Sequence, residues 1–383
     1  MKQGWEIKKL GEVCDFQGGS QPPKEEWIDE PREGYVRMLQ IRDFTQSRSF
    51  DIEYVKESNR LKYCNEDDVL LGRYGASVGK VLTGLAGAYN VAIMKTMPNK
   101  DLLNKSYFKY FLESPSFQVF LQQASTMRAA QAGFSKEDIQ DFTIPVPPRE
   151  EQERIVAELD CLSGVIEKKR EQLRELDALA QSIFYSMFGD PITNEKGWEV
   201  KKLGEVCKTT SGGTPSKGHN EYYEGGTIPW LRSGEVNKMY IYNAELFITE
   251  EGLQNSSAKW FPENTVVVAM YGATVGQVGI LKNKMTTNQA ICGIFPNEYF
   301  IPTYLYHFLL SKKEEYLKLA TGGAQPNISQ NIVRDTLVCC PPIATQQEFA
   351  DKIEAIEKQK ALIKQSIAQT ETLFNARMDY YFN

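Results

Sequence analysis

The hydrophobic pattern changes character twice along the chain. In 1–148 and again in 191–342, short β-branched runs such as residues 265–268 are broken by Gly, Pro and Asn, which is typical of strands and helices joined by turns. After each of these regions, apolar residues recur at alternating spacings of four and three, which predicts a long amphipathic helix. We therefore expect globular domains of mixed α/β (α+β) structure at 1–148 and 191–342, and helices at 149–190 and 343–383.

Each predicted helix carries a heptad seam, with Lys169 as the polar interruption in the first and Lys360 and Thr370 in the second. A seam of about 40 residues is some 60 Å long and cannot stay exposed to water. It packs either on its own domain or, as we expect, on the other seam. The apolar seam positions are Ile155, Leu159, Leu162, Ile166, Leu173, Leu176, Ala180, Ile183 and Met187, then Phe349, Ile353, Ile356, Ile363, Ile367 and Phe374.

The chain contains two copies of one design. Residues 4–14 recur at 197–207 with ten identities in eleven, and the loop 74–79 recurs at 271–276. Gly18-Gly19 matches Gly212-Gly213, and a Pro-Pro pair precedes both helices. A period near 194 residues indicates a domain duplication, because solenoid repeats are far shorter. If the helices pair antiparallel, an internal pseudo-two-fold axis relates the copies, and the chain imitates a symmetric dimer.

Composition narrows the class of protein. The chain of 383 residues has 44 basic and 50 acidic side chains, a net charge of −6 that argues against a protein coating nucleic acid without specificity. Its seven cysteines lack CxxC spacing and only two histidines could join them, so we expect no metal site. No apolar run is long enough to cross a membrane. We expect a cytoplasmic protein.

Catalytic motifs are missing from the sequence. Residues 75–81 resemble a phosphate-binding P-loop only faintly, because the stretch is one residue short and Gln277 stands where Lys80 is expected in the second copy. There is no Gly-x-Ser-x-Gly, no His-Glu-x-x-His and no methyltransferase Asp/Asn-Pro-Pro-Tyr/Phe motif. We therefore expect no catalytic residues in this chain.

Three pairs of matched segments supply candidates for DNA contact. The duplicated Gly loop is either a tight turn or a place where backbone amides and small side chains reach DNA phosphates. The segments 38–43 and 230–235 carry Arg and Gln, which suit guanine and adenine, although surface salt bridges with Asp43 and Glu235 explain them equally well. Small polar loops near 129–135 and 322–329 form the third pair. The candidates are Gln40, Arg42, Arg73, Tyr74, Ser77, Lys80, Gln131, Arg232, Ser233, Tyr271, Thr274, Gln277, Gln325 and Asn327.

The duplicated Gly-Trp-Glu-x-Lys-Lys-Leu-Gly-Glu-Val opening, the Tyr-Gly-Ala-Ser/Thr-Val-Gly loop and the Pro-Pro-x-x-x-Gln start of each helix occur in this order over the whole chain. Together they resemble the specificity subunit of a Type I restriction-modification system. The resemblance implies two globular target recognition domains, each reading one half of a split DNA site. A pair of long antiparallel coiled-coil helices would separate the domains and dock methyltransferase subunits.

The same resemblance implies the partners of the chain. They are double-stranded DNA, two methyltransferase (M) subunits and restriction (R) subunits, with no membrane. No cofactor is expected in this chain itself, since S-adenosylmethionine, ATP and Mg belong to the partner subunits. Two alternatives remain open: a self-contained DNA methyltransferase or nuclease, which the missing motifs count against, and a coiled-coil scaffold that does not bind DNA.

Overall fold

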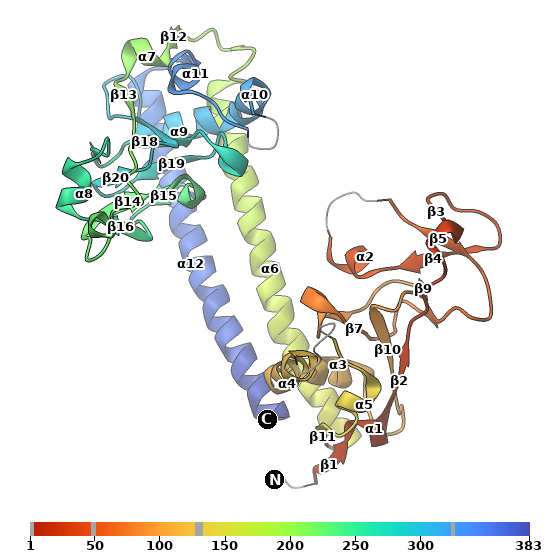
Figure 1. Ribbon diagram of the computed structural model, residues 1–383. Helices are drawn as coiled ribbons and strands as arrows, with labels where there is room; N and C mark the ends of the chain where they lie inside the picture. Colours follow the sequence, from red (N-terminus) through yellow and green to blue (C-terminus); the bar gives the residue numbers. More distant parts are fainter. Residues whose placement is uncertain (1–3, 47–50, 127–132, 323–325) are drawn as a thin grey trace. The chain divides into compact units, whose positions relative to one another are not determined.

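The computed structural model describes residues 4–46, 51–126, 133–322 and 326–383. Its internal contacts divide the chain into two units (Figure 1). Unit 1 comprises Met1–Arg170 and Gln365–Asn383, and unit 2 comprises Glu171–Lys364. Each unit therefore holds one globular domain together with half of each long helix.

Unit 1 contains three small sheets, in the strand orders β1-β11, β2-β10-β7-β8 and β3-β5-β4-β9-β6. In chain order its domain consists of β1 (Glu6–Lys9), α1 (Leu10–Val13), β2 (Cys14–Gly18), η1 (Lys24–Glu26), β3 (Trp27–Ile28), β4 (Tyr35–Leu39), α2 (Ile41–Thr45), β5 (Tyr54–Lys56), β6 (Tyr63–Cys64), β7 (Leu70–Gly72), η2 (Gly75–Ser77), β8 (Val81–Leu82), β9 (Gly87–Tyr89), β10 (Ile93–Pro98), α3 (Lys105–Glu113), α4 (Pro115–Thr126), α5 (Lys136–Ile139) and β11 (Thr143–Val146).

Unit 2 repeats this plan with the strand orders β12-β22, β13-β21-β18-β19-β15 and β16-β14-β20-β17. Its domain consists of β12 (Val200–Lys202), α7 (Leu203–Val206), β13 (Thr209–Ser211), η3 (Asn220–Tyr222), β14 (Ile228–Leu231), η4 (Ser233–Glu235), β15 (Tyr240–Ile241), β16 (Leu246–Ile248), α8 (Glu250–Gln254), β17 (Trp260–Phe261), β18 (Val266–Ala269), η5 (Gly272–Thr274), β19 (Val278–Leu281), β20 (Met285–Thr287), β21 (Ile291–Ile294), α9 (Pro302–Ser311), α10 (Lys313–Leu319), α11 (Gln330–Arg334) and β22 (Leu337–Cys339). The mixed structure expected from the sequence is confirmed.

The long helices are α6 (Arg149–Phe188) and α12 (Ile343–Phe382), both of 40 residues and 194 positions apart. Within unit 1, Glu158 of α6 binds Arg377 of α12, and Arg170 lies 2.7 Å from Glu371. A residue later in α6 thus pairs with a residue earlier in α12, so the helix halves run antiparallel, as expected. Unit 2 has the same direction, because Asp177 meets Lys360 at 2.7 Å and Phe184 meets Phe349 further along.

The polar residues that interrupt the seams have partners. Lys169 donates to the Ser366 hydroxyl, and Lys360 lies between the carboxylates of Asp177 and Glu357. Burial on its own would lower the pKa of Lys360, but these two carboxylates outweigh burial and raise that pKa above its ordinary value. The charge of Lys360 is therefore paired inside its seam, whereas the ammonium of Lys169 is held by a hydrogen bond to a neutral hydroxyl.

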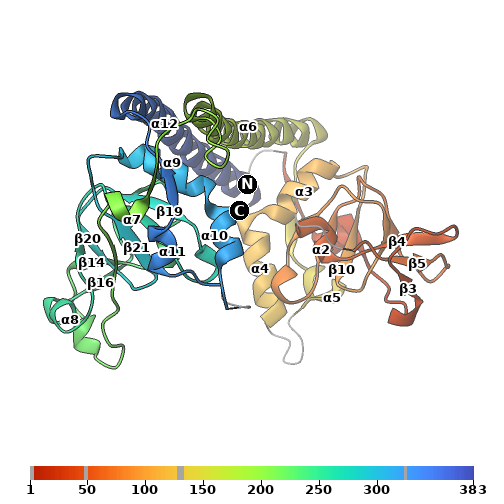
Figure 2. The same cartoon turned by 90° about the horizontal axis from the view of Figure 1, so that it is seen from above.

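A short helix fills the space between the helix pair and the strands in each unit. Figure 2 shows α9 between α12 and the strands of unit 2, where Tyr304 packs 4.7 Å from Phe188, measured between ring centres. In unit 1, α3 has the same position, and Tyr107 lies 5.2 Å from Phe382. Aromatic packing therefore joins each helix half to the domain of its own unit.

A buried glutamine fixes the start of each long helix. The Gln152 side chain donates to the carbonyls of Leu102 and Pro147 at 2.8 and 2.9 Å and accepts from the Asn104 amide at 2.7 Å. Gln346 makes the same three bonds in unit 2, to carbonyl oxygens of Tyr299 and Pro341 and from the amide of Ile301. The Pro-Pro-x-x-x-Gln sequence is thus a structural latch between helix and domain.

Replacing Gln346 by Leu should therefore destabilise unit 2. The substitution leaves a buried amide and two carbonyls without partners, at a cost of about 1–3 kcal/mol for each group. Chemical denaturation should show a clear loss of unfolding free energy. The adjacent, exposed Gln347, which bonds Asp351, supplies the control Gln347→Leu. Equal stability of the two variants would contradict the role of the latch.

Candidate nucleic-acid interface

Three strand pairs among the described strands are parallel, and two of them mark equivalent places in the two units; the third, β15 with β19, lies in unit 2. In unit 1, β4 runs parallel to β9, and in unit 2, β14 runs parallel to β20. The carboxyl ends of the paired strands meet at one edge, where ligands commonly bind. We call the turn that follows there, residues 89–93 in unit 1 and 287–291 in unit 2, the hub turn.

Three other chain segments join the hub turn of unit 1 through backbone hydrogen bonds. Asn90 N donates to Leu39 O at the end of β4, and Arg73 N, just before the Gly loop, donates to Ala92 O at 2.9 Å. From the segment after β2, Gly19 N donates to Ile93 O and Ser20 N to Tyr89 O, at 3.0 and 3.1 Å. The hub turn therefore holds loops that are far apart in sequence at one edge.

Unit 2 repeats these bonds one for one. Asn288 N donates to Leu231 O, and Met270 N donates to Ala290 O at 2.8 Å. Gly212 N and Gly213 N donate to Ile291 O and Thr287 O, at 3.2 and 2.9 Å. Two domains with different side chains thus share one backbone framework for loops at this edge.

The segment after β2 or β13 passes so close to the hub turn that only glycine fits there. A Cβ on Gly19 would lie 2.0 Å from the Asn90 oxygen, and one on Gly212 would lie 2.1 Å from Thr287 Oγ1. The hydrogen bonds pair Gly19 with Gly212, so the sequence pairing of Gly18-Gly19 with Gly212-Gly213 is shifted by one residue. Sequence alignment missed the shift because each copy offers two adjacent glycines at this position.

The duplicated Gly loops form short 3₁₀ turns, η2 and η5. Gly75 and Gly272 have φ of +56° and +68°, which explains why glycine is needed there. Thr274 Oγ1 donates to the Tyr271 carbonyl at 2.9 Å within the turn itself. The tight-turn interpretation accounts for the glycines, while the exposed outer surface of the turn leaves DNA contact open.

The candidate side chains around the Gly loops differ in their contacts and in their exposure to solvent. Arg73 Nε donates to the Phe134 carbonyl at 3.1 Å, and its guanidinium lies 5.1 Å from the centre of the Tyr74 ring. Lys80 is exposed, whereas Ser77, Tyr74 and Gln277 are half-buried and Tyr271 is exposed. These candidates surround one loop in each unit, next to the hub turn.

The segment that carries Gln40 and Arg42 differs from the expected strand end. Strand β4 ends at Leu39, Gln40 caps helix α2, and Arg42 lies within that helix, because Asp43 accepts from the Gln40 amide and starts the helix. Gln40 and Arg42 both bond the Glu53 carboxylate. Asp43, the partner proposed from the sequence, instead binds Arg37 at 2.6 Å.

Glu53 also accepts from Lys24, so three donors share one carboxylate. Burial alone would raise the pKa of Glu53, but the donors Lys24 and Gln40, with the charges of Lys24 and Arg42, bring it below its usual value. Glu53 therefore stays ionised and compensates positive charge beside the β4 end of unit 1.

Arg232 of unit 2 is likewise compensated. It caps η4, which begins at Ser233, and lies 3.3 Å from Glu235, as the salt-bridge interpretation predicts, and 3.0 Å from Glu245. Asn327 pairs with Tyr271 and Thr321 as isolated β-bridges beside the Gly loop. Gln131 and Gln325 lie outside the described residues.

Sequence reasoning missed two matched pairs at the hub turn. Asn90 and Asn288 are 198 positions apart, and Lys62 and Lys259 are 197 apart, each lysine preceding an aromatic residue that starts β6 or β17. The residues around each lysine differ between the two copies, so the match between Lys62 and Lys259 can be recognised only after the strands on either side are known. The signal available in the sequence was the shared Asn-x-Ala-Ile at 90–93 and 288–291.

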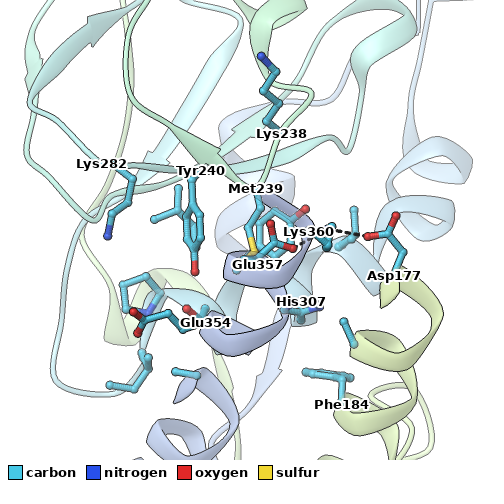
Figure 3. A pocket seen from close by; sticks show the side chains of 18 of the residues that line it. Asp177, Phe184, Lys238, Met239, Tyr240, Lys282, His307, Glu354, Glu357 and Lys360 are labelled. Carbon is cyan, nitrogen blue, oxygen red and sulfur yellow. Dashed lines mark hydrogen bonds and ion pairs between the residues drawn. The ribbon is translucent and has the colours of Figure 1, made fainter. Parts of the chain in front are cut away.

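Unit 2 also has a hollow of about 1420 Å³ beside its helices, lined from α6, α9, α12 and the segment before β15 (Figure 3). His307 lies in its wall, and burial, followed by the charge of Lys360, lowers the pKa of that histidine to about 4. His307 is therefore neutral near pH 7. Its ring packs 5.1 Å from Phe349, and Nε2 has no hydrogen-bond partner among the described residues. This surrounding fits packing better than acid–base catalysis.

Metal-binding geometry is not found in the described part of the chain, where no three His, Cys, Asp or Glu side chains cluster in a way that could hold an ion. The seven cysteines are free, and five of them are buried. Burial raises the pKa of Cys207 to about 12, so its thiol stays protonated and unreactive. Within the same described ranges, no helix is long and apolar enough to cross a bilayer.

Comparison with known proteins gives a consistent result. The sequence profile for the Type I restriction modification DNA specificity domain matches residues 2–177 and 195–372. The EcoR124I/EcoR124II specificity subunit of Escherichia coli is 27% identical over 62% of this chain, and the match spans 61% of that protein. The MjaVIII specificity subunit of Methanocaldococcus jannaschii is 24% identical over 93% of this chain and 86% of its own length.

Solved structures agree in fold. A structure from a study of complex assembly and conformational transition in the type I R-M system covers 100% of this chain and 98% of its own, at 18% identity and a TM-score of 0.63. The S subunit of the M. genitalium Type I system covers 99% and 96%, at 14% identity and a TM-score of 0.55. With a duplicated profile match over most of its length, the chain belongs to the family of Type I restriction modification DNA specificity domains and carries two copies of that domain.

Proposed function

We propose that this chain gives a Type I restriction-modification complex its DNA specificity by reading one half of a split target with each unit. The main support for this proposal is the duplicated hub turn, where four chain segments meet through the same backbone hydrogen bonds in both units. A shared framework with different side chains is what two readers of different half-sites need. Framework atoms and matched residues position the DNA, and unmatched residues read bases.

The unmatched residues next to the hub turns suggest how the half-sites differ. Gln40 in unit 1 corresponds to Arg232 in unit 2, and Val91 corresponds to the exposed Gln289. Glutamine suits adenine and arginine suits guanine in the major groove, whereas an apolar side chain can contact a thymine methyl. Arg232 would exchange its pairs with Glu235 and Glu245 for base contacts on binding.

The partners follow from the family. We infer that two M subunits and R subunits assemble on this chain, and that they hold S-adenosylmethionine, ATP and Mg, while this chain contributes no catalytic residue. The helix pair offers a surface for them. The segment 149–190, which contains α6, has six basic and ten acidic residues, and this balance suits protein contact better than DNA contact. Neither a self-contained methyltransferase or nuclease nor a scaffold without DNA binding is supported by the comparisons.

Methylome sequencing of a host that expresses the partner subunits, with and without this chain, tests the proposal. We expect one bipartite motif to be methylated only when the chain is present. Gly212→Ala, whose Cβ would lie 2.1 Å from Thr287, should abolish methylation by disrupting the hub turn of unit 2. Gly218→Ala in the same loop, with 3.8 Å of clearance from Ser216, should retain it. The same motif methylated without the chain would refute the proposal.

A further inference from the structure

Lys62 and Lys259 hold the same place beside the two hub turns. Lys62 precedes β6 and Lys259 precedes β17, and these strands pair antiparallel with β9 and β20, which lead into the hub turns. The Lys62 carbonyl accepts from the amide of Tyr89, the first residue of its hub turn, at 3.0 Å. Both lysines are therefore fixed by backbone pairing at the edge where the loops converge.

Neither ammonium group is neutralised by the protein. No described acidic side chain forms an ion pair with Lys62 or Lys259. Lys259 is exposed, and its Nζ donates to Thr210 Oγ1 at 2.8 Å, which steadies the side chain across β13 without cancelling its charge. Two of the basic side chains proposed from the sequence differ, since Arg42 shares Glu53 and Arg232 is paired with Glu235 and Glu245. Arg73 and Lys80, beside the Gly loop of unit 1, form no ion pair with a described acidic side chain either.

An uncompensated cation at a matched position in both domains is suited to an anion that every DNA target presents. The phosphate backbone is such an anion, whereas the bases differ between half-sites. We propose that Lys62 and Lys259 each bind a phosphate of the DNA backbone, one in each half-site, and align the hub turn with the groove. This inference rests on the proposed DNA recognition, and it assigns to these two lysines the part of DNA binding that does not depend on base sequence.

The test is the salt dependence of DNA binding by the assembled complex of this chain with its M subunits. Affinity for the methylated motif and for a scrambled duplex is measured over a series of KCl concentrations. Lys62→Ala and Lys259→Ala should each weaken binding to both duplexes by the same factor and reduce the slope of log K against log salt by about 0.9. The double variant should lose about twice that slope, and Lys→Arg should retain it.

Matched controls have the same charge at the opposite strand ends. Lys100 follows the end of β10, whereas the hub turn of unit 1 leads into the start of that strand. Lys208 precedes the start of β13, which pairs with the end of β21, and the hub turn of unit 2 lies at the other end of these two strands. Lys100→Ala and Lys208→Ala should leave the slope unchanged. Thermal unfolding and co-purification with M subunits establish that each variant is folded and assembled, and Lys→Gln at positions 62 and 259 provides a second charge-removing pair.

Three results would overturn the assignment. An unchanged slope in folded Ala and Gln variants would exclude phosphate binding by these lysines. A loss confined to the motif, with one base position relaxed, would make them base readers instead. Slope losses equal to those of Lys100→Ala and Lys208→Ala would show only the effect of net charge. Failure of the proposed function is separate, because the wild-type complex would then bind motif and scrambled DNA equally.

Discussion

Expressed alone, residues 1–190 should form a dimer. The core of unit 1 includes Met378, Tyr381 and Phe382, each at most 5% exposed, and this fragment lacks all three. Its own helix has Phe184, Met187 and Phe188 at the positions 194 residues earlier. A second copy can therefore fill the open core, and burying three large apolar side chains contributes roughly 5–9 kcal/mol at about 1.5–3 kcal/mol each.

Light scattering coupled to size-exclusion chromatography measures this dimer. Phe184→Asp in the fragment should prevent dimerisation, whereas Leu179→Asp on the exposed side of α6, where Leu179 is 47% exposed, should leave it intact. With M subunits present, the dimer of two identical first domains should methylate a palindrome of the first half-site. A soluble monomer that unfolds cooperatively would contradict the expectation.

Inserting four residues after Ile363 should change the gap in the DNA target and leave its bases unchanged. The insertion lies in α12 where the chain passes from unit 2 to unit 1, and four helical residues add about 6 Å, close to two base pairs of rise. A four-residue insertion is near one helical turn, so it rotates the flanking faces little.

Methylome sequencing of the insertion variant gives the gap directly. The control inserts four residues after Gly218, in a loop of unit 2, and should leave both the half-sites and the gap as they were. If the variant with the longer α12 kept its gap while its bases changed, the helices would not set the separation of the half-sites.

Periodic patterns made the helices predictable from the sequence. The seam and the Pro-Pro pairs placed them at 149–190 and 343–383, and they are observed at Arg149–Phe188 and Ile343–Phe382. Within each unit, seam residues of both helices share one core with the globular domain, so the seams pack on each other and also on the domain of their own unit. Such regularities are local, since spacing along the chain determines which face of a helix is apolar.

The candidate interface depended on contacts between distant segments, which one sequence does not reveal. The charge of Arg42 is compensated by Glu53, which precedes β5, so the sequence alone did not show whether Arg42 is free to contact DNA. Lys62 gains meaning only because β6 pairs with β9 at the hub turn. The roles of the other candidate residues in DNA contact remain predictions.

The division of the chain has a consequence for exchange of specificity between relatives. Unit 2 is one uninterrupted stretch, Glu171–Lys364, whereas unit 1 is assembled from the segments on both sides of it. Recombination with one crossover near 170 and another near 364 would replace a complete folding unit and leave the latch, the aromatic core and the helix contacts of the other intact. A crossover in the linker near residue 190 would instead cut through both cores. Gene shuffling that follows the ends of the globular domains is therefore expected to yield fewer folded chimaeras than shuffling in the middle of the two helices.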